Sequence, residues 1–424
     1  NQYHMTKENR MLEGLYTAMQ KKIFSKDWLR YNAPVLVCLA AILILIFLPT
    51  GFEGAVDYQG TERVRAEVLS VDNSTIVDTG LVRSGEQRCR LRIEEGMFKG
   101  VEADGVNMLN GSLEQDKIFY PGDQAMVVVS HQGDTILTVT ITDHYRLNWE
   151  LVMGAAFAVF LILFAGKTGL RAIGAFALTI LCLWKLLVPF YLRGWNPIWL
   201  GLGIILFLTV MIIGLVYGFD KRCAAAVSGS FLGILVTCLL GVFFTDLFKI
   251  HGAVMSYSES LLYSGFQDLN LTQIYMASIF IGASGAVIDL SVDIASAVYE
   301  VTEKRPDLLW KEATKSGLTV GRNAMGTMTT TLLFAYSGGY IALLMVFMAQ
   351  GTPIDQMLNY KYVAAELIHT VIGSFGLVTV APFTALCSGI LFTWGRKPGE
   401  VQAPLYAGGE AAGEAASAAN SEAK

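Results

Sequence analysis

Long apolar runs separated by short polar segments dominate the sequence. Eight of them approach or exceed the roughly 20 apolar residues that a helix needs to cross a bilayer. Residues 55–148 differ, because apolar and polar positions alternate there with period two. The pattern predicts a polytopic α-helical membrane protein with a small all-β extracytoplasmic domain between helices 1 and 2. The expected spans are at about 33–50, 149–166, 170–190, 197–217, 223–247, 273–299, 325–349 and 364–394.

The alternating segment predicts short strands joined by Gly-Asp turns at 122–123 and 133–134. We expect a small antiparallel barrel or sandwich, and we favour an OB-like barrel. An arginine row at 88, 90 and 92 either binds an acidic partner or forms a solvated strand face, and the second interpretation is favoured. The apolar positions of the alternation are Val64, Ala66, Val68, Cys89, Leu91, Ile93, Val139 and Ile141.

Composition supports the membrane assignment and narrows the function. Hydrophobic residues make up 53% of the chain and charged residues 16%, and the mean hydropathy is +0.48. The net charge of −5 argues against a nucleic-acid partner. Five of the six cysteines lie in apolar runs, and no CxxC or HxxxH spacing occurs. We therefore expect the lipid bilayer as a partner, and neither a metal site nor a cofactor.

Lysine and arginine are concentrated in every second loop, which predicts that both termini are cytoplasmic and that residues 55–148 lie outside. The expected parts are a cytoplasmic amphipathic segment 1–32, helix 33–50, the β domain 55–148, a seven-helix domain 149–394 and a disordered cytoplasmic tail 395–424. Residues 1–4 resemble a tag remnant. The basic residues of the orienting loops are Lys21, Lys22, Lys26, Arg30, Lys167, Arg171, Lys221, Arg222, Lys304, Arg305, Lys311, Lys315, Arg322, Arg396 and Lys397.

The sixth expected span carries Asp289 and Asp293 one turn apart in an apolar run. An ionised carboxylate inside a membrane helix costs about 2.5–3.5 kcal/mol, so such residues normally face a bundle interior or a water path. Asp289 lies roughly 20 Å along the helix from the outer end. We expect a proton or ion relay of Asp289, Asp293 and Glu300, although Asp293 and Glu300 also fit an interfacial position. We call the residues within about 40° of one line along this helix the polar line. They are Tyr275, Ser278, Gly282, Gly285, Asp289, Asp293, Ser296 and Glu300.

The two following spans offer polar groups that we expect to support this relay. On the seventh, Gly338-Gly339 predicts a break, and its threonines either line an ion path or bond their own backbone carbonyls. On the eighth, Glu366 and His369 lie near the outer end, which favours an interfacial position. The expected supporting residues are Ser296, Arg322, Asn323, Thr327, Thr330, Tyr336, Glu366 and His369.

Several motifs give the chain a resemblance to the YibE/F family of bacterial membrane proteins. They are MFKG at 97–100, GDQAMVVV at 122–129, GAVIDLSVDIASAVYEV, GRNAMGTMTTTLLFAYSGG and IGSFGLVTVAPFTAL. This resemblance implies the bacterial cell membrane. More weakly, residues 285–395 resemble the membrane half of SecD/SecF and RND-type proteins, which implies proton coupling and pairing with a second copy or a paralogous subunit. The FDRIRE turn of SecF is replaced here by VDIASAVYE.

Three functions remain open at this stage. The first is a proton- or cation-coupled transporter or translocation accessory with an unknown substrate. The second is an intramembrane serine protease with Ser284 of Gly282-Ala283-Ser284-Gly285 as nucleophile and His369 as base. The third is an assembly or scaffold protein whose polar stripe holds a partner helix. We favour the first, and thus no catalytic residues, because GxSG is a weak motif in a glycine-rich helix.

Overall fold

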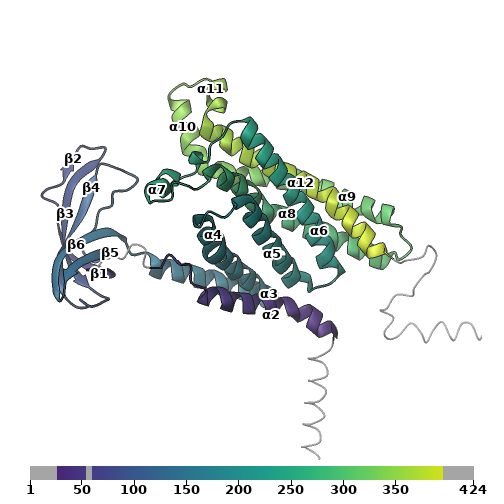
Figure 1. Ribbon diagram of the computed structural model, residues 1–424, viewed down its shortest axis with the longest axis horizontal. Helices are drawn as coiled ribbons and strands as arrows, with labels where there is room; N and C mark the ends of the chain where they lie inside the picture. The colour runs from purple at the N-terminus through teal and green to yellow at the C-terminus, as the bar shows by residue number, and fades with distance from the viewer. Residues whose placement is uncertain (1–25, 54–59, 395–424) are drawn as a thin grey trace, which may run out of the picture. The chain divides into compact units, whose positions relative to one another are not determined.

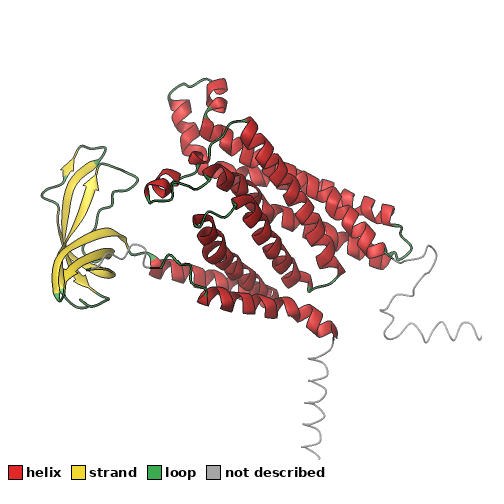
Figure 2. Ribbon diagram, in the orientation of Figure 1, coloured by secondary structure: helices red, strands yellow, loops and turns green. Residues whose placement is uncertain are grey.

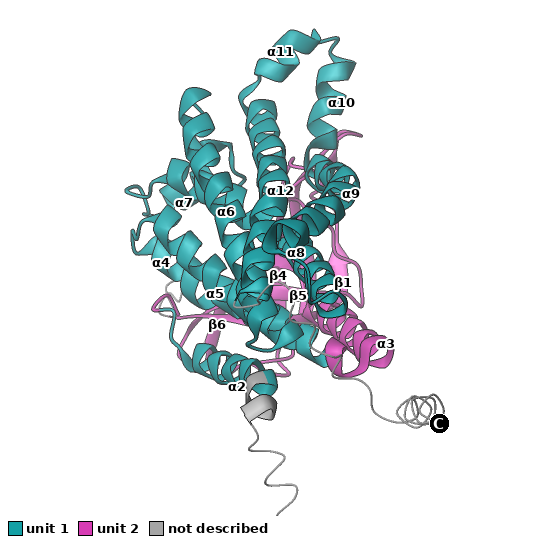
Figure 3. Ribbon diagram, turned by 90° about the vertical axis from the view of Figure 1, so that its right-hand side faces the viewer, with its two compact units in different colours: residues 1–50, 170–424 teal, residues 51–169 magenta. Residues whose placement is uncertain are grey.

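The structure is a computed structural model that describes residues 26–53 and 60–394. It consists of helices and one small β-barrel (Figures 1 and 2). The chain divides into two compact units, residues 51–169 and residues 1–50 with 170–424 (Figure 3). The predicted amphipathic segment before residue 26 and the predicted tail 395–424 lie outside the described residues.

Residues 61–144 form the β-barrel. Five strands close it in the order β1-β5-β6-β4-β3-β1, and β2 extends the sheet beside β3. The pairs are antiparallel except for β4 with β6. The prediction of a small β-barrel is confirmed, since the apolar positions of the alternation are buried inside it. The strands are β1 (Thr61–Asp72), β2 (Val77–Asp78), β3 (Arg83–Ile93), β4 (Glu102–Asn110), β5 (Gln124–Gln132) and β6 (Thr135–His144).

A buried amide fixes the long connection between β4 and β5 to the barrel. The side chain of Gln87 accepts a hydrogen bond from the Phe119 amide and donates one to the Phe119 carbonyl, both at 2.9 Å. It also accepts from Asn107 Nδ2 at 3.1 Å. Both polar side chains are fully buried, as is the ring of Phe119. Because the amide reproduces the pairing of a strand neighbour, the connection is held without a regular strand.

Six described helical stretches are long and apolar enough to cross a membrane, and a shorter apolar helix covers Tyr31–Phe47. The helices are α2 (Lys26–Phe47), α3 (Leu147–Cys182), α4 (Val188–Leu192), α5 (Pro197–Tyr217), α6 (Lys221–Leu247), α7 (Ser258–Tyr263), α8 (Leu271–Lys304), α9 (Trp310–Ser337), α10 (Ile341–Ala349), α11 (Ile354–Asn359) and α12 (Lys361–Thr393), with a π-helical turn at Leu183–Leu187 and 3₁₀ turns at Gly252–Val254 and Gly338–Tyr340.

The expected second and third spans, 149–166 and 170–190, fall within one helical stretch, Leu147–Leu192, which a kink at Gly166 divides into two helices. Gly166 interrupts it with φ 54° and ψ −124°, a left-handed conformation that glycine adopts without a steric penalty. The boundary between the two compact units follows at Gly169. The count of eight spans therefore stays a prediction.

The basic loop expected between the sixth and seventh spans is largely helical, so that expectation is wrong. Helix α9 begins at Trp310, and the carboxylate of Glu312 accepts a hydrogen bond from the Leu309 amide at 3.4 Å. An acidic group in the first turn stabilises a helix start. The predicted break at Gly338-Gly339 is present as a 3₁₀ turn between α9 and α10.

Small residues let α12 approach its neighbours closely. A Cβ at Gly233 of α6 would lie 2.8 Å from the Val380 side chain, and one at Gly321 of α9 would lie 2.8 Å from the Ala381 side chain. Interfaces of this kind are typical of helices packed in a membrane, where close backbone approach provides the attraction. Across α8 and α12, the hydroxyls of Ser291 and Thr384 bond at 3.1 Å.

Candidate functional site

Helix α8 has one buried face and one exposed polar face. Its start is capped by Asn270, whose side chain accepts from the Gln273 amide at 3.0 Å. The buried side packs against α5, α6, α9 and α12. The exposed positions on the opposite side include both carboxylates of the predicted relay. From Gly282 onward the predicted polar line is exposed at every position, at Gly282, Gly285, Asp289, Asp293, Ser296 and Glu300.

One end of this polar line enters a cavity of about 680 Å³. We call it the outer pocket, because it lies at the end of α8 that the basic loops predict to face outward. It is formed by the segment before α7, the starts of α8 and α12, and the region where α9 gives way to α10. Its polar residues are Ser256, Tyr275, Ser278, Tyr336, Tyr340, Tyr362, Glu366 and His369. The sequence predicts Glu366 and His369 beside each other near the outer end of the eighth span, and the structure places both in one pocket with Tyr275, Ser278 and Tyr336.

His369 contacts residues of both neighbouring helices in the outer pocket. Its ring stands edge-on to Tyr336, with centroids 4.7 Å apart, and its Nε2 lies 3.4 Å from the Ser278 hydroxyl. Tyr275 donates to the Ala365 carbonyl at 2.7 Å. The Tyr336 hydroxyl and His369 Nδ1 are buried and have no hydrogen-bond partner among the described residues. These two groups are available to a bound molecule or water.

Two glycines connect the outer pocket to the carboxylates. A Cβ at Gly282 would lie 2.9 Å from the Tyr336 hydroxyl and 3.1 Å from His369 Cε1, whereas a Cβ at Gly285 would meet nothing within 4 Å. Glycine at 282 therefore lets both side chains reach the surface of α8. The next polar group along this face is Asp289.

Asp289 lies near the middle of α8, about 27 Å from Leu271 and about 22 Å from Lys304 at the usual rise of 1.5 Å per residue. Within the described residues, neither Asp289 nor Asp293 has a hydrogen bond or an ion pair to a side chain. Both carboxylates are exposed at the surface of the chain. Such a group in a hydrocarbon layer needs water, a cation, a proton or a partner helix.

The far end of the polar line meets α5 and α6. The Tyr217 hydroxyl donates to the Val292 carbonyl at 2.7 Å and hydrogen-bonds with the Ser296 hydroxyl. Arg222 stacks over the rings of Tyr217 and Tyr299 at 5.0 and 4.7 Å. Beyond them, Glu300 forms an exposed pair with Lys304 at 2.6 Å. The polar line thus ends at an exposed ion pair, and the interfacial position of Glu300 stays a prediction.

The threonines of α9 hydrogen-bond to backbone carbonyls of their own helix, which was the alternative to their lining an ion path. The Thr327 hydroxyl donates to the Ala324 carbonyl at 3.1 Å, and that of Thr330 to the Gly326 carbonyl at 3.4 Å. Arg322 and Asn323 are exposed on the same helix. Across the described part of the chain, no hydrogen bond or ion pair joins these four residues to the carboxylates of α8. Tyr336 is the α9 side chain that reaches the polar line.

Ser284 lies away from this line. It is buried, and its hydroxyl donates to the Ile281 carbonyl one turn back at 2.6 Å. The serine that approaches His369 is Ser278, and its hydroxyl donates to the Tyr275 carbonyl at 2.7 Å. The Ser284–His369 pairing required by the protease hypothesis is absent from the described hydrogen bonds.

A sequence model described as "YibE/F-like protein" matches residues 153–394, more than half of the chain. The chain belongs to the YibE/F-like family. This confirms the family expected from the motifs on α8, α9 and α12. No curated protein and no solved structure matches the chain. The YibE/F-like region contains the whole polar line and every residue that lines the outer pocket, and the barrel lies outside it.

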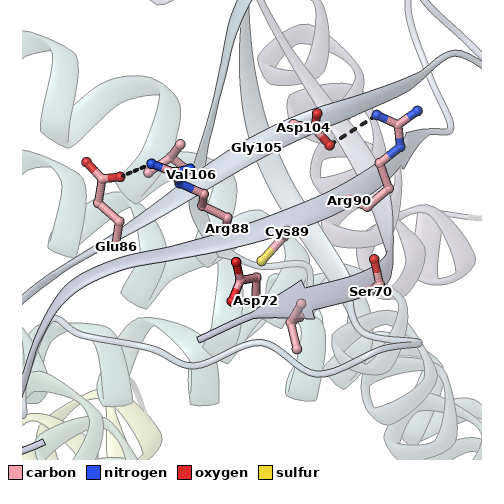
Figure 4. Close-up of a pocket in the computed structure, with 10 residues that line it drawn as sticks. Ser70, Asp72, Glu86, Arg88, Cys89, Arg90, Asp104, Gly105 and Val106 are labelled. Carbon is pink, nitrogen blue, oxygen red and sulfur yellow. Dashed lines mark hydrogen bonds and ion pairs between the residues drawn. The ribbon is translucent and has the colours of Figure 1, made fainter. Parts of the chain in front are cut away.

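The barrel that precedes the YibE/F-like region carries the arginine row on an ion-paired surface. Arg88 lies 3.5 Å from Glu86, and Arg90 lies 3.0 Å from Asp104 on the neighbouring strand (Figure 4). Cross-strand pairs of opposite charge stabilise a sheet modestly. Beneath them, Cys89 is buried, and burial raises the pKa of its thiol to about 11. The solvated strand face that we favoured agrees with these contacts.

Sequence reasoning missed several aromatic residues of the YibE/F-like region. Tyr340 and Tyr362 line the outer pocket, and Tyr217 reaches the other end of α8. Each lies at or near a helix end, where an aromatic residue normally signals only the membrane interface. No spacing along the chain connects them, because they come from α5, the turn before α10, and α12.

Proposed function

We propose that this chain is a proton- or cation-coupled membrane transporter or translocation accessory, in which Asp289 and Asp293 relay the ion. The observation that carries the proposal is the continuous polar line of α8. It begins at the outer pocket beside Glu366 and His369 of α12, and passes Gly282 and Gly285 to two carboxylates that have no ion-pair partner among the described residues. Keeping such carboxylates ionised in an apolar helix costs free energy unless they bind a cation or a proton.

The spacing along the line suits transfer between neighbouring groups. Asp289 and Asp293 are one helical turn apart, so they lie on the same face of α8. A pair of this kind holds a shared proton or a monovalent cation more readily than two separate charges. A membrane potential supplies about 2.3 kcal/mol per charge per 100 mV to move it.

The orientation and location that we propose follow from the distribution of basic residues. Both termini are cytoplasmic, the barrel and the outer pocket face the outside, and the membrane is the bacterial cell membrane. The strand order of the barrel, with one parallel pair between β4 and β6, supports an OB-like assignment. The weak likeness of residues 285–395 to SecD/SecF supports proton coupling and pairing with a second subunit.

Reconstituted protein tests this function. Wild-type protein in liposomes should dissipate an imposed pH gradient or take up a monovalent cation, followed with an internal pH-sensitive or cation-sensitive dye. Asp289→Asn should abolish the flux, because an amide keeps the size of the carboxyl but does not titrate. Asp246→Asn is the matched control, since Asp246 is exposed at the end of α6, outside the polar line. Equal flux in wild type and Asp289→Asn would contradict the proposed relay.

A scaffold role is the second candidate, and a specific observation supports it. Asp289, Asp293 and Gly285 are exposed on the surface of a single chain, and a partner helix would cover them. If this role applies, Asp289→Asn should weaken association with the partner and leave ion flux absent in every variant. Cysteines introduced at Gly285 should then form a disulfide-linked dimer in membranes, and those introduced at Ala297 provide the off-face comparison.

A further inference from the structure

We propose that the outer pocket binds a small organic monocation, an alkylammonium or a protonated amine. This rests on the proposed function only for its physiological meaning, because it names the class of substrate such a transporter would carry. The binding itself follows from the chemistry of the pocket. Its volume of about 680 Å³ falls within the range of roughly 300–1,000 Å³ that is usual for small-molecule sites.

The charge of the outer pocket is that of a single carboxylate. Among the described residues, Glu366 is the one acidic side chain that lines the cavity, and no lysine or arginine lines it. Glu366 is half-buried and has no ion-pair partner among the described residues. Tyr275, Tyr336 and Tyr340 line the same cavity as Glu366. A half-buried carboxylate is stabilised by a cation that replaces its lost hydration.

Aromatic rings select an organic cation over an inorganic one. Tyr336 and Tyr340 line the cavity beside Glu366, and the faces of such rings attract alkylammonium groups. Tyr362 is less available, because the ammonium of Lys361 already lies 4.9 Å from its ring centroid. The described residues hold no group of three or more His, Cys, Asp or Glu that could bind a metal ion. One carboxylate and several rings fit a quaternary or protonated amine.

Two further groups point to a bound molecule with polar atoms. The Tyr336 hydroxyl and His369 Nδ1 are buried without a partner, and buried polar groups normally have one. They belong to rings that contact each other at the wall of the cavity. A ligand with a hydroxyl or an N–H group next to its charged nitrogen would satisfy both.

Calorimetric titration of the purified full-length protein tests the proposal, with choline chloride as the probe and 3,3-dimethylbutan-1-ol as its uncharged isostere. Choline should bind, and the isostere should bind at least about tenfold more weakly. Glu366→Gln should lose at least about tenfold in choline affinity, while Glu259→Gln, on exposed α7, should lose none. Tyr336→Leu should lose about 2- to 30-fold, and Tyr336→Phe, which keeps the ring and loses only the hydroxyl, should lose less than Tyr336→Leu.

A labelling experiment avoids variants that fold poorly. Ser256 is exposed and lines the cavity, so choline should slow alkylation of a Ser256→Cys protein and leave a Ser264→Cys protein unaffected. Glycerophosphocholine distinguishes two possible natural ligands, a lipid headgroup and a free amine. Protection by both compounds indicates a lipid headgroup, and protection by choline alone indicates a free amine. Equal binding of choline and the isostere, or no protection by either compound, overturns the proposal. Choline binding without ion flux would instead count against the transporter alone.

Discussion

Tyr336 of α9 and His369 of α12 meet over a glycine of α8. Their ring centroids are 4.7 Å apart with planes at 83°, and a Cβ at Gly282 would approach both side chains at about 3 Å. Three helices thus converge where the outer pocket joins the polar line. The absence of a side chain at Gly282 keeps this junction open.

Substitution of two neighbouring glycines of α8 should have different effects on ion flux. Gly282→Val should displace Tyr336 or His369 and reduce ion flux by at least about tenfold, since overpacking of this kind costs about 1–3 kcal/mol. Gly285→Val should leave flux within about twofold, because a Cβ there meets nothing within 4 Å. Both variants are compared in the liposome assay at equal protein content. Loss of flux in both, or in neither, would contradict the assigned junction.

The protease hypothesis predicts something different at Ser284. Its hydroxyl bonds the Ile281 carbonyl of its own helix, and membrane side-chain hydrogen bonds contribute about 0.6 kcal/mol on average. Ser284→Ala should therefore lower stability by less than about 1 kcal/mol and leave function in cells intact. A fluorophosphonate probe should label neither protein. Labelling of wild type that disappears in Ser284→Ala would establish the enzyme instead.

The sequence pattern was sufficient for the elements whose signal is local. Period-two alternation located β1, β3 and β6, and helix-length apolar runs located α5, α6, α8 and α12 within a few residues. Strand β4 was missed, because its sequence EADGVNMLN contains acidic residues and a glycine that strands disfavour. Its glycine is required by closure of the barrel, since a Cβ at Gly105 would lie 2.4 Å from the Leu91 side chain.

The candidate site was predictable only in part, because the pattern of residues along the chain reports local structure and not tertiary packing. Helical periodicity alone aligned Asp289, Asp293 and Ser296 on one face of α8. The outer pocket was not predictable, because tertiary packing brings Tyr336 of α9 together with Glu366 and His369 of α12. The supposed α9 partners failed to appear beside the carboxylates because the threonine hydroxyls are satisfied within their own helix.

The barrel offers a prediction about Gln87. Gln87→Leu removes both hydrogen bonds to Phe119 and leaves buried backbone groups unpaired, which costs about 1–3 kcal/mol. Amide exchange of residues 111–120 in the full-length protein should then accelerate by about 5- to 150-fold. Gln115→Leu, at an exposed position of the same connection, should change it little. Unchanged protection in Gln87→Leu would mean that other contacts hold the connection.

Asp116 predicts a pH dependence in the same connection. Its carboxylate accepts hydrogen bonds from the Asn110 amide at 2.9 Å and the Ser112 amide at 2.8 Å, which hold its pKa below its usual range. A lowered folded-state pKa stabilises the fold above the unfolded-state value of about 4, and this contribution is lost as the pH falls through the folded-state pKa.

Protection of the amides at 110–112, corrected for intrinsic exchange, should therefore decrease below about pH 4 in the wild type. Asp116→Asn should be less protected at neutral pH and should show little further decrease on acidification. Glu114→Gln, an exposed neighbour, should behave as wild type. A wild-type profile that is flat with pH would contradict the role given to Asp116.

The proposed relay requires that Asp289 gains and loses a proton in the middle of α8. Infrared difference spectroscopy of the reconstituted protein measures this protonation, because a protonated carboxyl has a carbonyl stretch separate from that of a carboxylate or an amide. A carboxyl band should appear on acidification, be absent from Asp289→Asn and persist in Asp246→Asn. A spectrum in which Asp289→Asn titrates identically to wild type would contradict the proposed relay.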